Sequence, residues 1–233
     1  MSSLGTVLVH GGFHGAWCWE LVQPLLDQPS IAIDLPGRGP RPFAGRQVTF
    51  ADCVDAVREE ADAAGFDRFV IVGHSMGGLT VSTVALAMPE RVAHGVYLAA
   101  LAPPPGVTLH QLFQIPDDVN NDPLGTTPVP DAATSRAMFS ADLSDEVWDR
   151  YHAMCVPEAN GLFLDTIPGY DHGVPMTYVR CNRDAVVPQA LVDLCVANIN
   201  PVEVIDLESD HDAMLSHPAE TAAVINRIVA AAS

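Results

Sequence analysis

One stretch of the sequence, residues 69–79, restricts the fold more than any other. It begins with a β-branched apolar run, from Phe69 to Val72, and ends in an apolar segment with the character of a helix. Between them lies a G-x-S-x-G pattern centred on Ser75, and the strand–turn–helix context is the one in which such a serine is exposed on a sharp turn. Glycine at both ends of the pattern removes side chains that would collide across the turn. The stretch therefore predicts an α/β fold with Ser75 at the carboxyl end of a strand.

Segments of strand and helix length alternate along the rest of the chain. Because strands that alternate with helices pair in parallel through right-handed crossovers, we expect a mainly parallel sheet. The predicted strands are 6–9, 30–39 with its closing turn, 69–73, 92–101, 176–181 and 202–207. The predicted helices are 16–26, 49–64, the segment after Ser75 to about 89, 144–154, 188–199 and 218–231.

Four residues with chemical potential each follow a predicted strand: Gly12, Ser75, Asp184 and His211. Reactive groups in a parallel α/β sheet lie at the carboxyl ends of its strands, so we expect these four residues to share one edge. A serine hydroxyl becomes a nucleophile when a base removes its proton and a carboxylate orients that base. The order serine, acid, histidine along the chain is the one found with this kind of turn.

The base and the acid each have alternatives in the sequence. Two histidines follow Asp184, and the second, His217, precedes a proline at a helix start, which predicts a surface or capping residue. His211 in the loop after the last strand is therefore the predicted base. The acids that compete with Asp184 are Asp206, within a strand, Glu208, and Asp210, which adjoins the histidine. We predict a catalytic triad of Ser75, Asp184 and His211.

The loop after the first strand, His10 to Gly15, is predicted to supply an oxyanion hole. Acyl transfer puts negative charge on a former carbonyl oxygen, and backbone N–H groups must already point at it. The predicted donors are the N–H groups of Gly12 and of Met76, the residue after the serine. Phe13 and His14 are predicted substrate contacts, although for both His10 and His14 hydrogen bonding to the backbone of the loop is favoured over a catalytic role.

Residues 103–173 are rich in proline and acidic turn residues and are predicted to form a lid inserted into a core of residues 1–102 and 174–233. Ser144 begins a predicted helix with an acidic first turn. Trp148 on this helix is predicted to face the substrate pocket. The alternative is that Trp148 only packs the lid onto the core.

Composition excludes several classes of function. The net charge of −18 opposes binding to nucleic acid and to anionic membranes. No export signal is visible at Met1–Gly5, and five cysteines without a C-x-x-C pair indicate reduced thiols and a cytoplasmic location. The nine histidines lack metal-binding spacings, so neither a metal nor another cofactor is expected. A small-molecule ester is the expected partner, and a homodimer is left open.

Several motifs carry a resemblance to the α/β-hydrolase superfamily. They are Val9–Trp17, Gly73–Gly78, Pro89–Val92, Ser209–His211 and Ser216–Pro218. Within the superfamily the chain resembles the branch of plant methylesterases and hydroxynitrile lyases, and bacterial carboxylesterases that are similar to pyrethroid hydrolases. The resemblance implies the triad given above. It also implies a six-stranded parallel sheet, because the chain starts at the strand usually counted third.

Two departures from relatives narrow the chemistry. The lyases of this branch have a lysine after the catalytic histidine to stabilise cyanide, whereas this chain has Asp212, so lyase activity is disfavoured. Epoxide hydrolases and haloalkane dehalogenases need a carboxylate where this chain has Ser75. The leading hypothesis is a serine carboxylesterase for a small to medium hydrophobic ester, methyl esters included. The alternatives are hydrolysis of a lactone, a thioester or a carbon–carbon bond, and a ligand receptor without catalysis.

Overall fold

A six-stranded parallel sheet forms the centre of the computed structural model, which describes residues 3–42 and 45–233. The strand order is β2-β1-β3-β4-β7-β8, and every neighbouring pair is parallel. The predicted α/β fold with a six-stranded parallel sheet is therefore confirmed. The strands are β1 (Leu4–Val9), β2 (Ser30–Ile33), β3 (Arg68–His74), β4 (Val92–Leu98), β7 (Met176–Cys181) and β8 (Glu203–Leu207).

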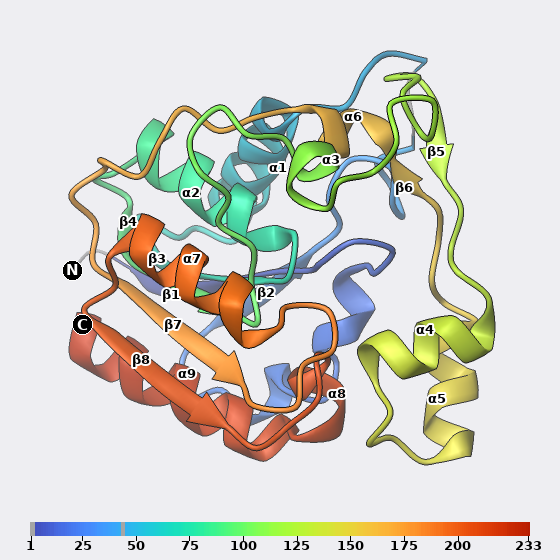
Figure 1. Cartoon of the computed structure of the whole chain (residues 1–233). Coiled ribbons are helices and arrows are strands. Elements are labelled where there is room, and N and C mark those ends of the chain that lie inside the picture. The colour runs from blue at the N-terminus through green and yellow to red at the C-terminus, as the bar shows by residue number, and fades with distance from the viewer. Residues whose placement is uncertain (1–2, 43–44) are drawn as a thin grey trace.

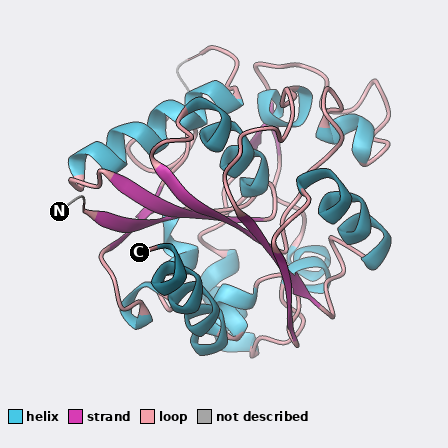
Figure 2. Ribbon diagram, turned by 90° about the vertical axis from the view of Figure 1, so that its left-hand side faces the viewer, coloured by secondary structure: helices cyan, strands magenta, loops and turns pink. Residues whose placement is uncertain are grey.

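Helices cover both faces of the sheet, which explains the continuous apolar strands (Figure 2). Along β1, Val7 and Val9 belong to one hydrophobic cluster while Leu8 belongs to the other. The first cluster is completed by α1 (Phe50–Ala63), α2 (Gly77–Ala87) and α7 (Gln189–Ile199), and the second by α9 (Pro218–Ala232) and the short α8 (Ala213–Ser216). Successive strand residues point to opposite faces, so a strand between two helix layers buries every position.

The helix predicted over 16–26 is wrong in kind. The structure has two short 3₁₀ helices instead, η1 (Ala16–Trp19) and η2 (Gln23–Leu25). Pro24 lacks an N–H group and its ring would collide with a preceding turn of α-helix, so a continuous helix is interrupted there. The strand predicted over 92–101 is also shorter, because Ala99 has a φ of 46° and leaves the extended conformation.

The predicted start of α1 at Thr49 and its stop at Gly65 agree with the structure. Thr49 and Asp52 form a capping box in which each side chain accepts a hydrogen bond from the other residue's backbone N–H. Gly65 has a φ of 72°, in the left-handed region that glycine adopts without cost. Strong local signals of this kind fix where a helix begins and ends.

Residues 103–173 contain only short elements. These are α3 (Leu109–Leu112), β5 (Thr126–Thr127), α4 (Ala132–Phe139), α5 (Asp145–His152), β6 (Glu158–Ala159) and α6 (Asn160–Leu164), with β5 and β6 paired antiparallel. Ser144 caps α5, which ends two residues earlier than predicted. Figure 1 shows α4 and α5 beyond the arrowheads of β7 and β8, at the edge where the predicted site lies.

Met1 and Ser2, part of the N-terminal stretch predicted to lack an export signal, lie outside the described residues. Among the helices that the structure describes, none is both long enough and apolar enough to cross a bilayer.

Candidate active site

Ser75 sits on a sharp turn between β3 and α2, where steric crowding dictates glycine on both sides. Ser75 has a φ of 52°, a conformation that is strained for a residue with a side chain. A Cβ atom built on Gly73 would lie 2.5 Å from the carbonyl oxygen of Gly77, and one built on Gly77 would lie 2.8 Å from that of His10. The local sequence therefore allows this turn, and it places Ser75 on a cavity wall.

His211 and Asp184 form the hydrogen bond that the sequence predicts. His211 Nδ1 lies 2.7 Å from Asp184 Oδ2, and both side chains are at most 2% exposed. The other oxygen, Asp184 Oδ1, accepts hydrogen bonds from the backbone N–H groups of Val186 and Val187 at 2.7 and 2.9 Å. Because a carboxylate can only accept, Nδ1 carries the proton and Nε2 presents a lone pair. Nε2 is buried and has no hydrogen-bond partner within 3–42 and 45–233.

His211 lies close to the strand end that carries Ser75. The ring of His74, the residue before Ser75, is 4.6 Å from the His211 ring between centroids. His74 Nε2 lies 3.1 Å from the carbonyl oxygen of His211 and donates to it. Burial, together with the nearby His211, lowers the pKa of His74 well below its usual range. His74 is therefore a neutral side chain that ties the histidine loop to the serine turn.

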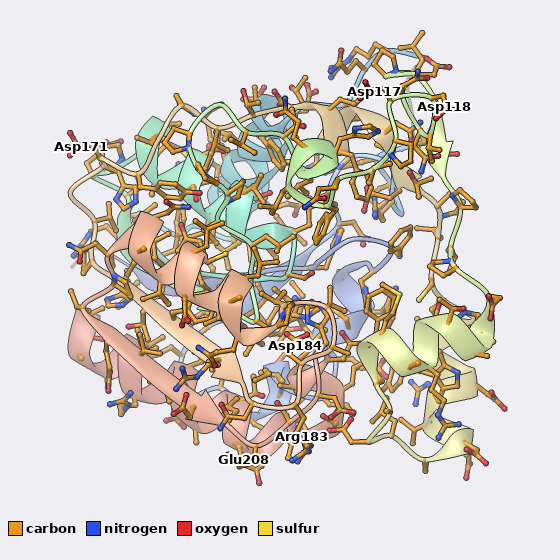
Figure 3. All side chains as sticks on the ribbon, in the orientation of Figure 1. Asp117, Asp118, Asp171, Arg183, Asp184 and Glu208 are labelled. Carbon is orange, nitrogen blue, oxygen red and sulfur yellow. The ribbon has the colours of Figure 1, made fainter. Side chains whose placement is uncertain are left out.

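The competing residues are engaged elsewhere. The carboxylate of Asp206 pairs with Arg180 at 2.6 Å, and that of Asp210 lies 3.2 Å from Arg183 Nε. His217 faces Ser216 and the carboxylate of Asp142. Figure 3 shows Asp184 near the middle of the view, whereas Arg183 and Glu208 lie near its lower edge.

The two predicted oxyanion donors are free to bind a ligand. Gly12 and Met76 both line the cavity, and within the described chain their backbone N–H groups have no acceptor. His10 orients the first donor: its Nδ1 donates to the Gly11 carbonyl oxygen at 2.8 Å, while its Nε2 accepts from Leu35 N–H at 3.1 Å. A planar trans peptide has its C=O and N–H on opposite sides, so this bond aims the Gly12 N–H the other way.

The three predicted substrate contacts lie in different surroundings. Phe13 lines the cavity and has a φ of 64°. His14 is buried behind the loop, bonded to the Gly12 carbonyl and to Asp212, and is not among the cavity-lining residues. Trp148 is also placed away from the cavity wall: it packs in the second hydrophobic cluster, with its ring 5.1 Å from that of His152. The apolar face of α5 is thus used for packing.

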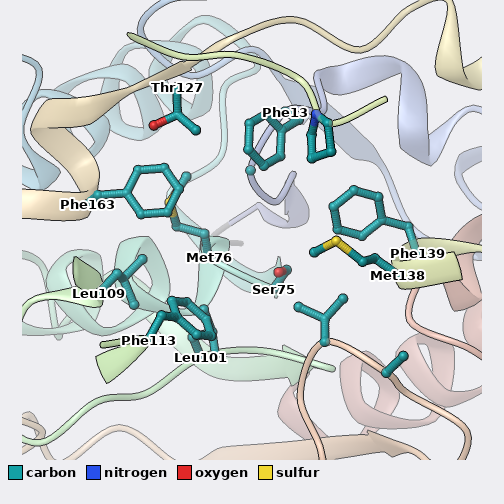
Figure 4. Close-up of a pocket in the computed structure, with 14 residues that line it drawn as sticks. Phe13, Ser75, Met76, Leu101, Leu109, Phe113, Thr127, Met138, Phe139 and Phe163 are labelled. Carbon is teal, nitrogen blue, oxygen red and sulfur yellow. The ribbon is translucent and has the colours of Figure 1, made fainter. Parts of the chain in front are cut away.

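A cavity of about 350 Å³ opens beside Ser75. Figure 4 shows Ser75 between Met138 and Phe139 on one side and Phe163 on the other. None of its fourteen lining residues is charged, and half of them come from 103–173: Leu109, Phe113, Thr127, Pro130, Met138, Phe139 and Phe163. A cavity of this composition suits an uncharged, largely apolar molecule.

Sequence reasoning missed the buried ion pair between Arg38 and Glu158. Both side chains are at most 3% exposed and make two hydrogen bonds to each other. Glu158 Oε2 also accepts from the N–H of Phe13 at 3.0 Å, and Arg38 Nε donates to the carbonyl of His14 at 2.9 Å. The pair therefore holds the backbone of the loop that is predicted to supply the oxyanion hole. The one available signal in the sequence was Glu158 itself, a lone acidic residue between Pro157 and Asp165.

Three groups that often bind metals, His74, His211 and Asp212, lie within 4.8 Å of one another. His211 Nδ1 and His74 Nε2 already have partners inside the protein, and one Asp212 oxygen accepts two hydrogen bonds. This donor set is therefore explained by the hydrogen-bond network around His211.

A serine on a strand–helix turn, at the carboxyl edge of a parallel sheet and beside a buried His–Asp pair, is the architecture of an α/β-class hydrolase. The chain belongs to the alpha/beta hydrolase family, whose model matches residues 6–224. The resemblance seen in the motifs is confirmed, and the chain is a hydrolase.

Individual proteins of known identity resemble this chain over nearly its full length. Methylesterase 10 of Arabidopsis thaliana is 30% identical over 253 residues, which cover 96% of this chain and 91% of the relative. Norfluorocurarine synthase 2 of a Strychnos species is 27% identical over 241 residues, covering 92% and 91%. The crystal structure of polyneuridine aldehyde esterase superposes with a TM-score of 0.80 at 25% identity and covers 97% of this chain and 99% of that one. These similarities support an esterase.

Proposed function

We propose that this protein is a serine carboxylesterase that hydrolyses small to medium, uncharged hydrophobic esters, methyl esters included. The observation that carries the proposal is the apolar cavity that opens on Ser75, Gly12 and Met76 beside the hydrogen-bonded pair of His211 and Asp184. The similarity to a methylesterase and to an esterase structure supports the same chemistry.

In the proposed reaction, Ser75 Oγ attacks the ester carbonyl carbon and its proton moves to His211 Nε2. Asp184 keeps the other ring proton on Nδ1 and stabilises the imidazolium that forms. The N–H groups of Gly12 and Met76 bind the oxygen that becomes negative. The alcohol leaves with the proton from Nε2, and a water molecule, activated by the same nitrogen, then releases the acid and restores Ser75.

We further propose that residues 103–173 act as a lid that determines substrate choice. Half of the cavity lining comes from this segment, so the size and shape of the substrate pocket depend on it. Since no lining residue is charged, a charged group on the substrate would lose its hydration without a partner. The cytoplasmic location and the homodimer stay predictions of the sequence.

A panel of p-nitrophenyl esters tests the proposal. Neutral acetate, butyrate and hexanoate esters are expected to be hydrolysed, together with methyl esters of apolar acids. A p-nitrophenyl monoester of succinate, which carries a carboxylate, is expected to show a kcat/KM at least about 100-fold lower than the butyrate ester, because its charge would be buried unpaired. Equal turnover of both would contradict the neutral-substrate proposal, and no turnover of any ester would contradict the esterase.

Two lid variants separate pocket from packing. Phe163→Ala enlarges the cavity and should shift the preferred acyl chain to a longer one, changing relative kcat/KM by roughly tenfold. Trp148→Ala removes a side chain that is 5% exposed and should cost about 3–5 kcal/mol of stability while leaving the chain-length preference as it is. Melting temperature and the chain-length profile are measured on both variants. A changed profile for Trp148→Ala would restore its role in the pocket.

A further inference from the structure

His14 is held between two hydrogen-bond acceptors. Its Nδ1 lies 2.7 Å from the carbonyl oxygen of Gly12, and its Nε2 lies 3.2 Å from Asp212 Oδ2. A carbonyl oxygen can only accept, so Nδ1 carries a proton. Asp212 Oδ2 also accepts from the Ser140 hydroxyl at 2.8 Å, so it acts as a carboxylate and Nε2 is protonated as well. His14 is therefore an imidazolium in a buried ion pair whose side chains are at most 3% exposed.

The charges around His14 agree with this protonation. Burial alone would lower the pKa of His14, but the Asp212 carboxylate and its hydrogen bond outweigh burial and raise that pKa above 6.5. Burial would raise the pKa of Asp212, but His14, His74 and His211 hold it well below its usual range. The other titratable groups that face His14 are Arg38, which lowers its pKa, and the neutral His10 and His74.

The pair is intact over a defined pH range. The raised pKa of His14 means that its contribution to stability is complete below pH 6.5 and is lost as pH rises through the higher folded value. The lowered pKa of Asp212 means that its contribution is complete above pH 3.8 and is lost only in stronger acid. Both groups are therefore charged between the lowered pKa of Asp212 and the raised pKa of His14, and His14 is the group that titrates on the alkaline side.

His14 acts on the residue that supplies an oxyanion donor. Gly12 lacks a side chain and is intrinsically free to rotate, so its peptide groups need external anchors. His10 anchors the carbonyl of Gly11, His14 anchors the carbonyl of Gly12, and Glu158 anchors the next N–H, that of Phe13. The Gly12 N–H has no acceptor within the described residues, and Gly12 lines the cavity.

We propose that His14 and Asp212 are positioning residues for the oxyanion hole: the ion pair keeps a proton on His14 Nδ1, and that proton fixes the peptide between Gly12 and Phe13, on the C-terminal side of the Gly12 donor. This role rests on the proposed ester hydrolysis. When His14 loses one proton, Asp212 retains the remaining one on Nε2, because a lone pair there would face a carboxylate. Nδ1 then turns a lone pair toward the Gly12 carbonyl oxygen and the contact becomes repulsive. The peptide between Gly12 and Phe13 turns away, and rotation about Gly12 displaces the donor N–H that His10 holds only through the Gly11 carbonyl.

The composition of the chain leaves few other side chains that would titrate in the alkaline range. The sequence has no lysine. Burial raises the pKa of all four tyrosines and all five cysteines, the lowest of those given a value being Cys195 at about 11. A loss of activity between pH 7 and 10 therefore has few other sources.

The experiment compares the wild type with Asp212→Asn. For the wild type, kcat for p-nitrophenyl acetate, corrected for uncatalysed hydrolysis, is expected to fall by roughly 100-fold above the pKa of His14 with little change in KM, as for loss of one oxyanion donor. In Asp212→Asn the amide donates to Nε2, so neutral His14 keeps its proton on Nδ1. The alkaline fall in kcat should disappear, and the NMR signals of the His14 ring should titrate at a lower pH than in the wild type.

Two further variants make the result specific. His14→Asn/Asp212→Asn removes both charges and keeps an N–H near the position of Nδ1, so it should also lack the alkaline fall. His217→Asn changes another histidine beside a carboxylate, 3.6 Å from Asp142 and away from Gly12, and should keep the wild-type profile. An alkaline fall at the wild-type pH in Asp212→Asn, or unchanged titration of His14, would overturn the proposal. If no ester is hydrolysed at all, the proposed function fails, and the NMR titration still decides whether the ion pair exists.

Discussion

Replacing Ser75 by alanine is expected to lower kcat for p-nitrophenyl esters by about 10⁴-fold or more, because the attacking oxygen is lost while the binding site remains. The fold should survive. The Ser75 side chain makes no hydrogen bond to the described chain, and alanine has the same steric preference at a φ of 52°. The melting temperature should therefore change by little, and kcat and melting temperature are measured together.

Covalent labelling adds an independent measurement of the same assignment. A neutral alkyl fluorophosphonate is expected to phosphonylate Ser75 Oγ with release of fluoride, which adds the phosphonyl mass to the intact protein. Ser82→Ala on α2, the helix that follows Ser75, is the matched control, because Ser82 bonds to Gly78 and Tyr97 and does not line the cavity. Ser82→Ala should still be labelled, and Ser75→Ala should not. Near-normal turnover or labelling of Ser75→Ala would show that another residue is the nucleophile. Absence of both turnover and labelling in the wild type would favour the alternative of a ligand receptor without catalysis.

The sequence predicts the parts of the site that local sterics determine. The turn at Ser75 needs glycine at both ends because each Cβ would meet backbone atoms. The five-residue pattern alone therefore predicts the turn. The positions of Asp184 and His211 follow from the topology, since both residues come directly after strands of a parallel sheet. The hydrogen bond between them is the point where two such predictions meet.

Contacts between distant segments were not predictable in this way. Asp212 and His14 are 198 residues apart, and Glu158 and Phe13 are 145 apart, so no local pattern joins them. For Trp148, helical periodicity identifies an apolar face but does not say whether it faces a cavity or another layer. The helix predicted over 16–26 failed because Pro24 outweighs the apolar period around it.

The proposed acid, Asp184, gives the second large expected effect. Asp184→Asn should lower kcat by on the order of 10⁴-fold, through the tautomer of His211 and not through loss of structure. The size of this expected loss of kcat depends on how firmly the Asp184 carboxylate is held. Because the N–H groups of Val186 and Val187 both point at Oδ1, the amide of the variant must place its oxygen there. Its NH₂ group then faces His211 Nδ1.

An NH₂ group opposite Nδ1 requires a lone pair on that nitrogen, so the remaining ring proton moves to Nε2. A protonated Nε2 cannot accept the proton of Ser75, and the base is disabled although every heavy atom stays in place. Asp206→Asn and Asp210→Asn are isosteric controls, since their carboxylates face Arg180 and Arg183, and each should retain most of the activity. The three variants are compared by kcat and melting temperature under one set of conditions. A loss confined to Asp210→Asn would transfer the role to Asp210, because only the residue that fixes the tautomer of His211 has this effect without unfolding the chain.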